Sequence, residues 1–203
     1  MILQPRFTED VSELPTFKFG SSSLTFWGII GFMVIEGAGF ALAFAAYFFI
    51  MGHEQGWPPE GRVAPDVLAG TLFTIVILVS EIPNTIIKRA ARAGDVPAIR
   101  LLLPVMVAVG LVLLIIRAFE FNSLNCLWSD NAYASVIWTL LVLHAAHLGT
   151  DWADTVVLWA LIMTPLGYEP RRLVDVDENS LYWRYVWLLW IPIYLLIYWV
   201  PRL

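Results

Sequence analysis

Five long apolar runs are the feature of this sequence that most constrains its fold. They cover residues 26–51, 66–88, 101–121, 132–163 and 181–200. Each run reaches the roughly 20 residues that a helix needs to cross a bilayer. Hydrophobic residues make up 59% of the chain and charged residues only 14%, too few to cover a water-facing surface. The sequence therefore predicts an all-α membrane protein whose five transmembrane helices form one domain, residues 26–203.

The distribution of basic residues predicts the orientation of these spans. Residues 1–25 lack the basic start and apolar core of a signal peptide, so we expect them to form a cytoplasmic surface tail. With the N-terminus inside, the outer segments contain only Arg62 and Arg202. The inner segments then contain Arg6, Lys18, Lys88, Arg89, Arg92, Arg100, Arg171 and Arg172. Because cytoplasmic loops are enriched in Lys and Arg, we expect a cytoplasmic N-terminus and a periplasmic C-terminus.

Composition also excludes several classes of function. The net charge is −5 and the basic residues form no stripe, which argues against a nucleic-acid partner. A single cysteine, Cys126, allows no internal disulfide. The three histidines are too few to ligate the haems and copper of a catalytic haem-copper subunit. We therefore expect no catalytic residue, metal site or cofactor in this chain.

Ionisable side chains at membrane depth are costly, so each is a functional candidate. Glu36 lies near the middle of the first span, and Glu81 lies in the inner half of the second. Arg117 and Glu120 are three residues apart on the third span, hence on one helix face, where they can form an ion pair. That pair is compatible with packing between helices or with a contact to a lipid headgroup or a partner subunit.

The fourth span carries a polar stripe. His144, His147, Asp151 and Asp154 follow one another at i, i+3, i+7 and i+10, which places them on one face of a helix. Three interpretations stay open: a metal or haem site, hydrogen-bonded packing between helices, and a path for protons or water. Two histidines on one helix cannot supply opposite axial ligands to a single haem, and a Glu-x-x-His pair is missing at Glu120.

Six short motifs follow one another along the spans and loops. They are Ile35-Glu36-Gly37-Ala38-Gly39-Phe40 with Ala46-Tyr47-Phe48, then Trp57-Pro58-Pro59, Arg117-Ala118-Phe119-Glu120-Phe121, Asp130 with Tyr133 and Ser135, His144-Ala145-Ala146-His147, and Tyr182-Trp183-Arg184-Tyr185-Val186 with Ile197-Tyr198-Trp199. In this order they resemble motifs of subunit III of the haem-copper terminal oxidases, in its short bacterial form with five helices. The resemblance covers nearly the whole chain and places Glu36 on the family's membrane carboxylate.

The chain also departs from the family pattern. Arg184 stands where the family has His, Trp187 where it has Asp, and Ala134 where it has Gly. Asp177 stands where the family has Glu, and Asp151 with Asp154 matches no family motif.

The resemblance implies a non-redox subunit of the bacterial inner membrane. It would pack on catalytic subunit I, which would hold haem and copper, beside the other subunits of a respiratory oxidase. It would form a V-shaped bundle with phospholipids in a cleft between its first two helices and the rest. It would support proton uptake and lipid-mediated access of oxygen.

Several alternatives remain. The pattern also occurs in quinol oxidases and in a protein associated with nitric oxide reductase, so the electron donor and the oxygen or nitric oxide chemistry stay open. Other classes are a stand-alone proton or solute channel and an intramembrane metalloenzyme. The sequence lacks the internal repeat that many transporters carry, which counts against a stand-alone channel.

Overall fold

The computed structural model describes residues 17–203, and these are helical without any strand. The long helices are α1 (Leu24–Met51), α2 (Val67–Ala93), α3 (Val96–Asn122), α4 (Ala132–Ile162) and α5 (Pro170–Tyr194). A π-helical turn (Leu195–Trp199) and a 3-10 turn (Val200–Arg202) continue α5 to the C-terminus. Within the described residues five helices are long and apolar enough to cross a membrane, which confirms the predicted fold class. Most of the expected N-terminal tail, residues 1–16, lies outside the described part.

Helices α2 and α3 form a hairpin with a very short turn. Gly94 ends α2 with φ of 73°, a left-handed conformation that favours glycine. Asp95 then caps α3 by accepting a hydrogen bond from the backbone N–H of Ala98. Helix α2 ends and α3 begins about one helical turn beyond the limits of the apolar runs. The segment between the two runs carries several charged residues, so hydropathy alone predicts a loop there.

The start of the fifth helix corrects the predicted boundaries. The apolar run begins at residue 181, but α5 begins at Pro170, whose ring is preorganised for the first helical position. The additional turns carry Arg171, Arg172, Asp175 and Asp177. Hydropathy reports which part of a helix can lie in lipid, not where the helix begins, so a polar extension of a transmembrane helix escapes it.

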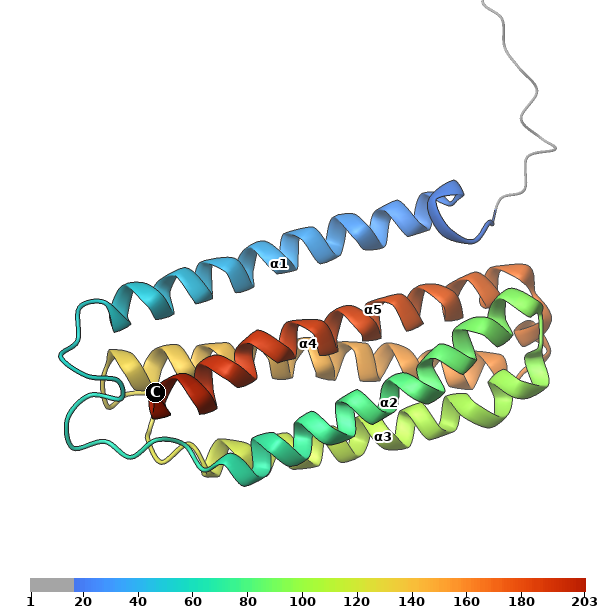
Figure 1. Ribbon diagram of the computed structural model, residues 1–203. Coiled ribbons are helices and arrows are strands. Elements are labelled where there is room, and N and C mark those ends of the chain that lie inside the picture. The colour runs from blue at the N-terminus through green and yellow to red at the C-terminus, as the bar shows by residue number, and fades with distance from the viewer. Residues whose placement is uncertain (1–16) are drawn as a thin grey trace, which may run out of the picture.

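The arrangement of the helices also corrects the expected grouping. Helix α2 packs against α3 and α5, α3 packs against α4, and α4 packs against α5. Helix α1 lies along α4 and, to a lesser extent, α5, apart from the α2–α3 hairpin (Figure 1). The first two helices therefore do not form one arm of the molecule. Helix α1 stands against a bundle made by the other four.

Large apolar side chains fill the bundle, and two glycines allow helices to approach closely. Trp183 and Trp190 of α5 are buried and donate hydrogen bonds to Ser80 and Thr74 of α2. A Cβ on Gly70 would lie 2.5 Å from the ring of Tyr198, and one on Gly110 would lie 2.5 Å from Cδ1 of Trp152. These positions require glycine because a side chain already occupies the space.

Candidate functional site: an intramembrane polar cavity

Helices α1, α4 and α5 line an open cavity of about 620 Å³. One part of its wall is apolar and includes Ile29, Phe32, Val157, Leu158 and Leu161. The rest carries polar and ionisable side chains: Glu36, His147, Thr150, Asp151, Asp154, Arg172, Asp175, Glu178, Asn179 and Tyr182. The cavity is therefore the place where most of the intramembrane polar groups of α1, α4 and α5 meet.

Glu36 is the group that joins α1 to this cavity. Its Oε2 accepts a hydrogen bond of 2.7 Å from the hydroxyl of Tyr182, and its Oε1 lies 3.1 Å from Nε2 of His147. Nδ1 of His147 lies 2.6 Å from the carbonyl oxygen of Leu143, so Nδ1 carries a proton and donates it there. The contact between Nε2 of His147 and Oε1 of Glu36 then requires one more proton to form a hydrogen bond. Whether this proton is bound to His147 or to Glu36, the pair has no net charge.

A second polar cluster lies inside the four-helix bundle, away from the cavity. Arg117 donates a 2.6 Å hydrogen bond to Oε2 of Glu120, and Tyr198 donates one of 2.5 Å to Oε1. The guanidinium lies between the rings of Phe73 and Trp190, 3.8 and 4.3 Å from their centroids. Arg117 is 2% and Glu120 0% exposed. The predicted ion pair is present, and its charge is balanced within the bundle rather than directed toward lipid.

His144 belongs to this second cluster. Its Nδ1 lies 3.0 Å from a terminal nitrogen of Arg117. Because a guanidinium only donates, Nδ1 is the acceptor and the proton resides on Nε2, which donates to the carbonyl oxygen of Val186 at 3.1 Å. His144 is therefore neutral, with both ring nitrogens engaged inside the protein.

The polar stripe of α4 is thus divided among several neighbours. His144 interacts with α3 and α5, His147 with α1, and Asp151 and Asp154 with Asn179 of α5. The four side chains share a helix face but do not converge on one point. Among residues 17–203, no three His, Cys, Asp or Glu side chains are grouped so that they could hold a metal ion.

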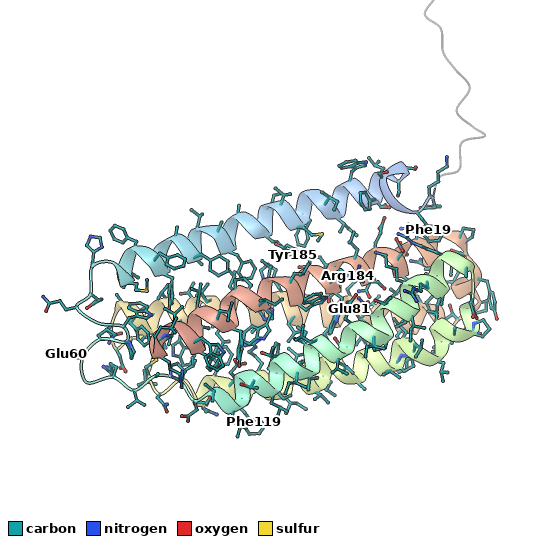
Figure 2. The ribbon with its side chains drawn as sticks, in the orientation of Figure 1. Phe19, Glu60, Glu81, Phe119, Arg184 and Tyr185 are labelled. Carbon is teal, nitrogen blue, oxygen red and sulfur yellow. The ribbon has the colours of Figure 1, made fainter. Side chains whose placement is uncertain are left out.

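Arg184 and Trp187, two residues at which the chain departs from the family motifs, both donate hydrogen bonds to the carboxylate of Glu81. Arg184 donates to Glu81 from α5, through Nε at 2.8 Å and through a terminal nitrogen, and Trp187 donates to the other oxygen of Glu81 at 3.1 Å. Figure 2 shows Arg184 and Glu81 directed toward each other between α5 and α2. Asn84 and Thr85 complete the set of donors. Arg184 and Trp187 therefore join α5 to α2 through the side chain of Glu81.

Asp177 lies near the start of α5. Both of its oxygens accept hydrogen bonds from Arg92, at 2.7 and 3.2 Å. Asp177 is 3% exposed, whereas the side chain of Arg92 is 52% exposed. This pair ties the polar start of α5 to the end of α2.

Several partners in these clusters were not selected from the sequence. Tyr182, Asn179, Tyr198 and Glu178 were not among the candidates, although Glu178 accepts a 2.6 Å hydrogen bond from Thr25 of α1. Two sequence signals were present: Tyr182 and Tyr198 stand in the motifs that carry the family resemblance, and Asn179 and Tyr182 are three residues apart on one helix. That spacing gives a shared face but does not identify which helix the face contacts.

Comparison with known proteins agrees with this arrangement. A family model described as cytochrome c oxidase subunit III matches residues 17–201. The chain belongs to this family. The five helices that are long and apolar enough to cross a membrane agree with this family.

Curated relatives named cytochrome c oxidase subunit 3 show the same relationship. The Synechocystis sp. protein is 26% identical over 180 residues, which are 88% of this chain and 77% of the relative. The Thermostichus vulcanus protein is 25% identical over 183 residues, 86% of this chain and 87% of the relative. The Alkalihalophilus pseudofirmus protein is 23% identical over 195 residues, 92% of this chain and 90% of the relative.

Proposed function

We propose that this chain is a non-redox subunit III of a respiratory haem-copper oxidase in the bacterial inner membrane. It packs against the catalytic subunit, which holds haem and copper, and it supports proton uptake, lipid binding and access of oxygen during turnover. The observation that carries the proposal is the family match over residues 17–201. The names of the relatives favour cytochrome c as the electron donor of the complex.

The Glu36–His147 pair supports a role in proton supply. The pair contains one proton that can lie on either partner, with Tyr182 holding the other carboxylate oxygen at 2.7 Å. The pair lines the cavity among α1, α4 and α5, which gives water a place beside it. A carboxylate and an imidazole in contact are suited to exchange a proton with such water.

The surface of the chain supports a role as a packing subunit. Helix α1 buries only Phe40, Ala43 and Tyr47, while side chains such as Ile35 and Leu42 are 73% exposed. Arg117, Glu120 and His144 are all engaged within the chain, so the outer faces that remain are largely apolar. Such faces suit lipid and the apolar helices of another membrane subunit.

The proposal is tested by comparing the purified oxidase with and without this chain. Because no electron passes through it, we expect the initial rate of oxygen reduction to be largely retained after its removal. Activity should then decline faster over successive turnovers, and adding the purified chain back should restore the lifetime. Loss of haem or copper in proportion to the removed chain contradicts the proposal.

A matched pair of variants tests the proton role separately. Glu36→Gln keeps an acceptor for Tyr182 but cannot exchange a proton with His147, so we expect an assembled complex with a shortened lifetime. Tyr182→Phe removes one hydrogen bond to Glu36 and leaves the proton-sharing contact in place, so it should have a smaller effect. If Glu36→Gln prevents assembly, Glu36 is a structural ion-pair partner and the proton role is wrong.

A further inference from the structure

Asp151 is the most deeply buried acid of the cavity, and its carboxyl group has few hydrogen-bond donors around it. The residue is 2% exposed, and its Oδ2 is closed off from solvent and accepts no hydrogen bond from any described residue. Its Oδ1 lies 3.4 Å from the terminal amide nitrogen of Asn179, longer than the usual distance of about 2.9–3.0 Å. A charged carboxylate removed from water with so little support is costly, whereas a neutral acid is much less so.

The nearest donors are engaged elsewhere. The hydroxyl of Thr155 has one proton, and it donates to the backbone oxygen of Asp151 at 2.9 Å rather than to the carboxyl group. The two amide hydrogens of Asn179 are shared among three oxygens, since its nitrogen also lies 3.3 Å from Oδ2 of Asp154 and 3.1 Å from Oγ1 of Thr155. Asn179 therefore holds the carboxyl group of Asp151 in place without satisfying both of its oxygens.

The basic groups that α1, α4 and α5 direct toward the cavity are also engaged. Arg172 donates to Asp175 at 2.8 Å, and Nε2 of His147 lies 3.1 Å from Glu36. The remaining titratable side chains that line the cavity with Asp151 are Asp154, Glu178 and Tyr182. Because none of these three becomes positively charged, they do not balance a negative charge on Asp151. A proton bound to the carboxyl group does.

Asp151 also lies between the exposed end of the polar stripe and the Glu36–His147 pair. His147, Asp151 and Asp154 are spaced i, i+4 and i+7 on α4, so they share a face, and His147 and Asp151 are about 6 Å apart along the helix axis. All three residues and Glu36 line the same open cavity. Asp154 is exposed, whereas the side chains of His147 and Glu36 are 11% and 12% exposed. A polar cavity of this size has room for water that connects groups at such distances.

We propose that Asp151 stores a proton in the resting protein and passes it, through water in the cavity, to the Glu36–His147 pair. This inference rests on the proposed role of that pair in proton supply and adds a second proton-exchange residue to it. Asp151 lies outside the motifs that carry the family resemblance, so those motifs do not imply this role.

Each step of the exchange conserves protons and charge. When the Glu36–His147 pair gives up its shared proton, a carboxylate and a neutral imidazole remain. The O–H bond of Asp151 then breaks, its proton moves through water to the pair, and the negative charge passes to Asp151. Because that charge has few donors around it, Asp151 takes up a new proton from water on the side of the exposed Asp154. The cycle restores both groups and delivers one proton.

Infrared spectroscopy of the purified complex that contains the full chain tests the stored proton. The main variant is Asp151→Asn, because an amide has nearly the size and shape of the neutral acid and should leave the complex assembled. Asp175→Asn is the matched control, the same change at a cavity acid that is paired with Arg172. At neutral pH, the spectrum of the wild type minus that of Asp151→Asn should contain the carbonyl band of a protonated carboxylic acid. The corresponding difference for Asp175→Asn should contain the bands of an ionised carboxylate.

The pH dependence of turnover tests the transfer of the proton. Protons are scarcer at alkaline pH, so the loss of a store should have its largest effect there. We expect the Asp151→Asn complex to last as long as the wild type at slightly acidic pH and to complete at least about twofold fewer turnovers before inactivation at alkaline pH. Asp175→Asn should keep the wild-type profile. An equal loss at every pH indicates a packing role and contradicts the store.

The remaining results separate this proposal from the proposed function. Ionised carboxylate bands in the wild type minus Asp151→Asn spectrum overturn the store, and so does failure of Asp151→Asn to assemble, because the carboxylate charge is then required. A wild-type pH profile in Asp151→Asn, while removal of the whole chain shortens the lifetime of the complex, overturns the store and leaves the proposed function standing. If removal of the whole chain leaves the lifetime unchanged, the proposed function fails together with the store.

Discussion

At the scale of single residues, burial determines how much an ion pair contributes to the stability of this protein. Arg117 and Glu120 are enclosed by Phe73, Trp190 and Tyr198, so neither charge has access to water. Arg62 and Asp130 form a pair of similar length, 2.8 Å, between the α1–α2 and α3–α4 connections, where the side chains are 36% and 24% exposed. The same chemistry should therefore give very different energies at the two places.

The buried pair gives the first prediction. Glu120→Gln leaves Arg117 as a buried charge without its carboxylate, and breaking a buried pair in this way costs about 3–5 kcal/mol. Denaturation of the purified chain in mixed micelles measures the change in unfolding free energy. Arg62→Gln is the control and should cost less than about 1 kcal/mol, as exposed pairs do. Equal losses for the two variants contradict the argument.

Cys126 gives a prediction of pH dependence. Burial of the thiol, with a smaller contribution from the negative charge of Asp130, raises its pKa above the ordinary value. Since the thiolate is the reactive form, less of it is present at neutral pH and labelling by a maleimide should be slow there and accelerate as pH rises. Asp130→Asn removes the neighbouring charge, so it should increase the labelling rate at a fixed pH. A rate that is independent of pH refutes the assignment.

At the scale of elements, the sequence predicted which segments are helices better than where they begin. The first four spans agree with α1 to α4 because apolar length alone identifies a membrane-crossing helix. The start of α5 was missed by eleven residues, since residues 170–180 are polar and lie beyond the apolar run. Turn geometry at Gly94 and Asp95, rather than hydropathy, sets the ends of α2 and α3.

The candidate site could be predicted only one helix at a time. The spacing of Arg117 and Glu120 predicted their contact because both lie on one helix. The contacts of His147 with Glu36 and of Arg184 with Glu81 join helices that are far apart in sequence. Those contacts depend on how the helices pack, which periodicity within one segment does not contain.

Close helix packing gives the third prediction. Gly110→Ala places a Cβ 2.5 Å from the ring of Trp152, whose Nε1 donates to the carbonyl oxygen of Val107 at 2.9 Å. The ring must move and weaken that hydrogen bond, so α3 and α4 should separate slightly at a cost of about 1–3 kcal/mol. Denaturation of the purified chain in mixed micelles measures this change in unfolding free energy.

Gly149 on α4 supplies the matched control for this packing prediction. A Cβ there meets no atom within 4 Å, so Gly149→Ala removes backbone freedom without a clash. It should leave stability unchanged or raise it by up to about 1 kcal/mol. If both alanine variants change the unfolding free energy by the same amount, the close approach at Gly110 does not contribute to stability.

At the scale of the whole molecule, α1 differs from the four-helix bundle in how it is held. Its hydrogen-bonded attachments to α4, α5 and the C-terminal turn are few: Thr25 to Glu178, Glu36 to His147 and Tyr182, the carbonyl oxygen of Met33 to Tyr185, and Tyr47 to the carbonyl oxygen of Leu196. Only Phe40, Ala43 and Tyr47 of α1 are buried. Helices α2 to α5 contribute most of the buried apolar side chains of the core. The cavity lies where α1 meets α4 and α5, so changes in its polar groups should affect the position of α1 more than the bundle itself.

Orientation in the membrane gives the last prediction. The excess of Lys and Arg in the segments that flank α2, α3 and the start of α5 predicts that the turn at residues 93–95 lies in the cytoplasm and the loop at 52–66 outside. In a Cys126→Ser background, Glu60→Cys should react with a membrane-impermeant maleimide added to the outside of spheroplasts. Ala93→Cys, which is also exposed, should react only in inverted vesicles, where the cytoplasmic face is turned out. Both sites lie outside the buried clusters, so neither variant disturbs the packing that the comparison depends on. Labelling of Ala93→Cys from the outside would contradict the predicted orientation.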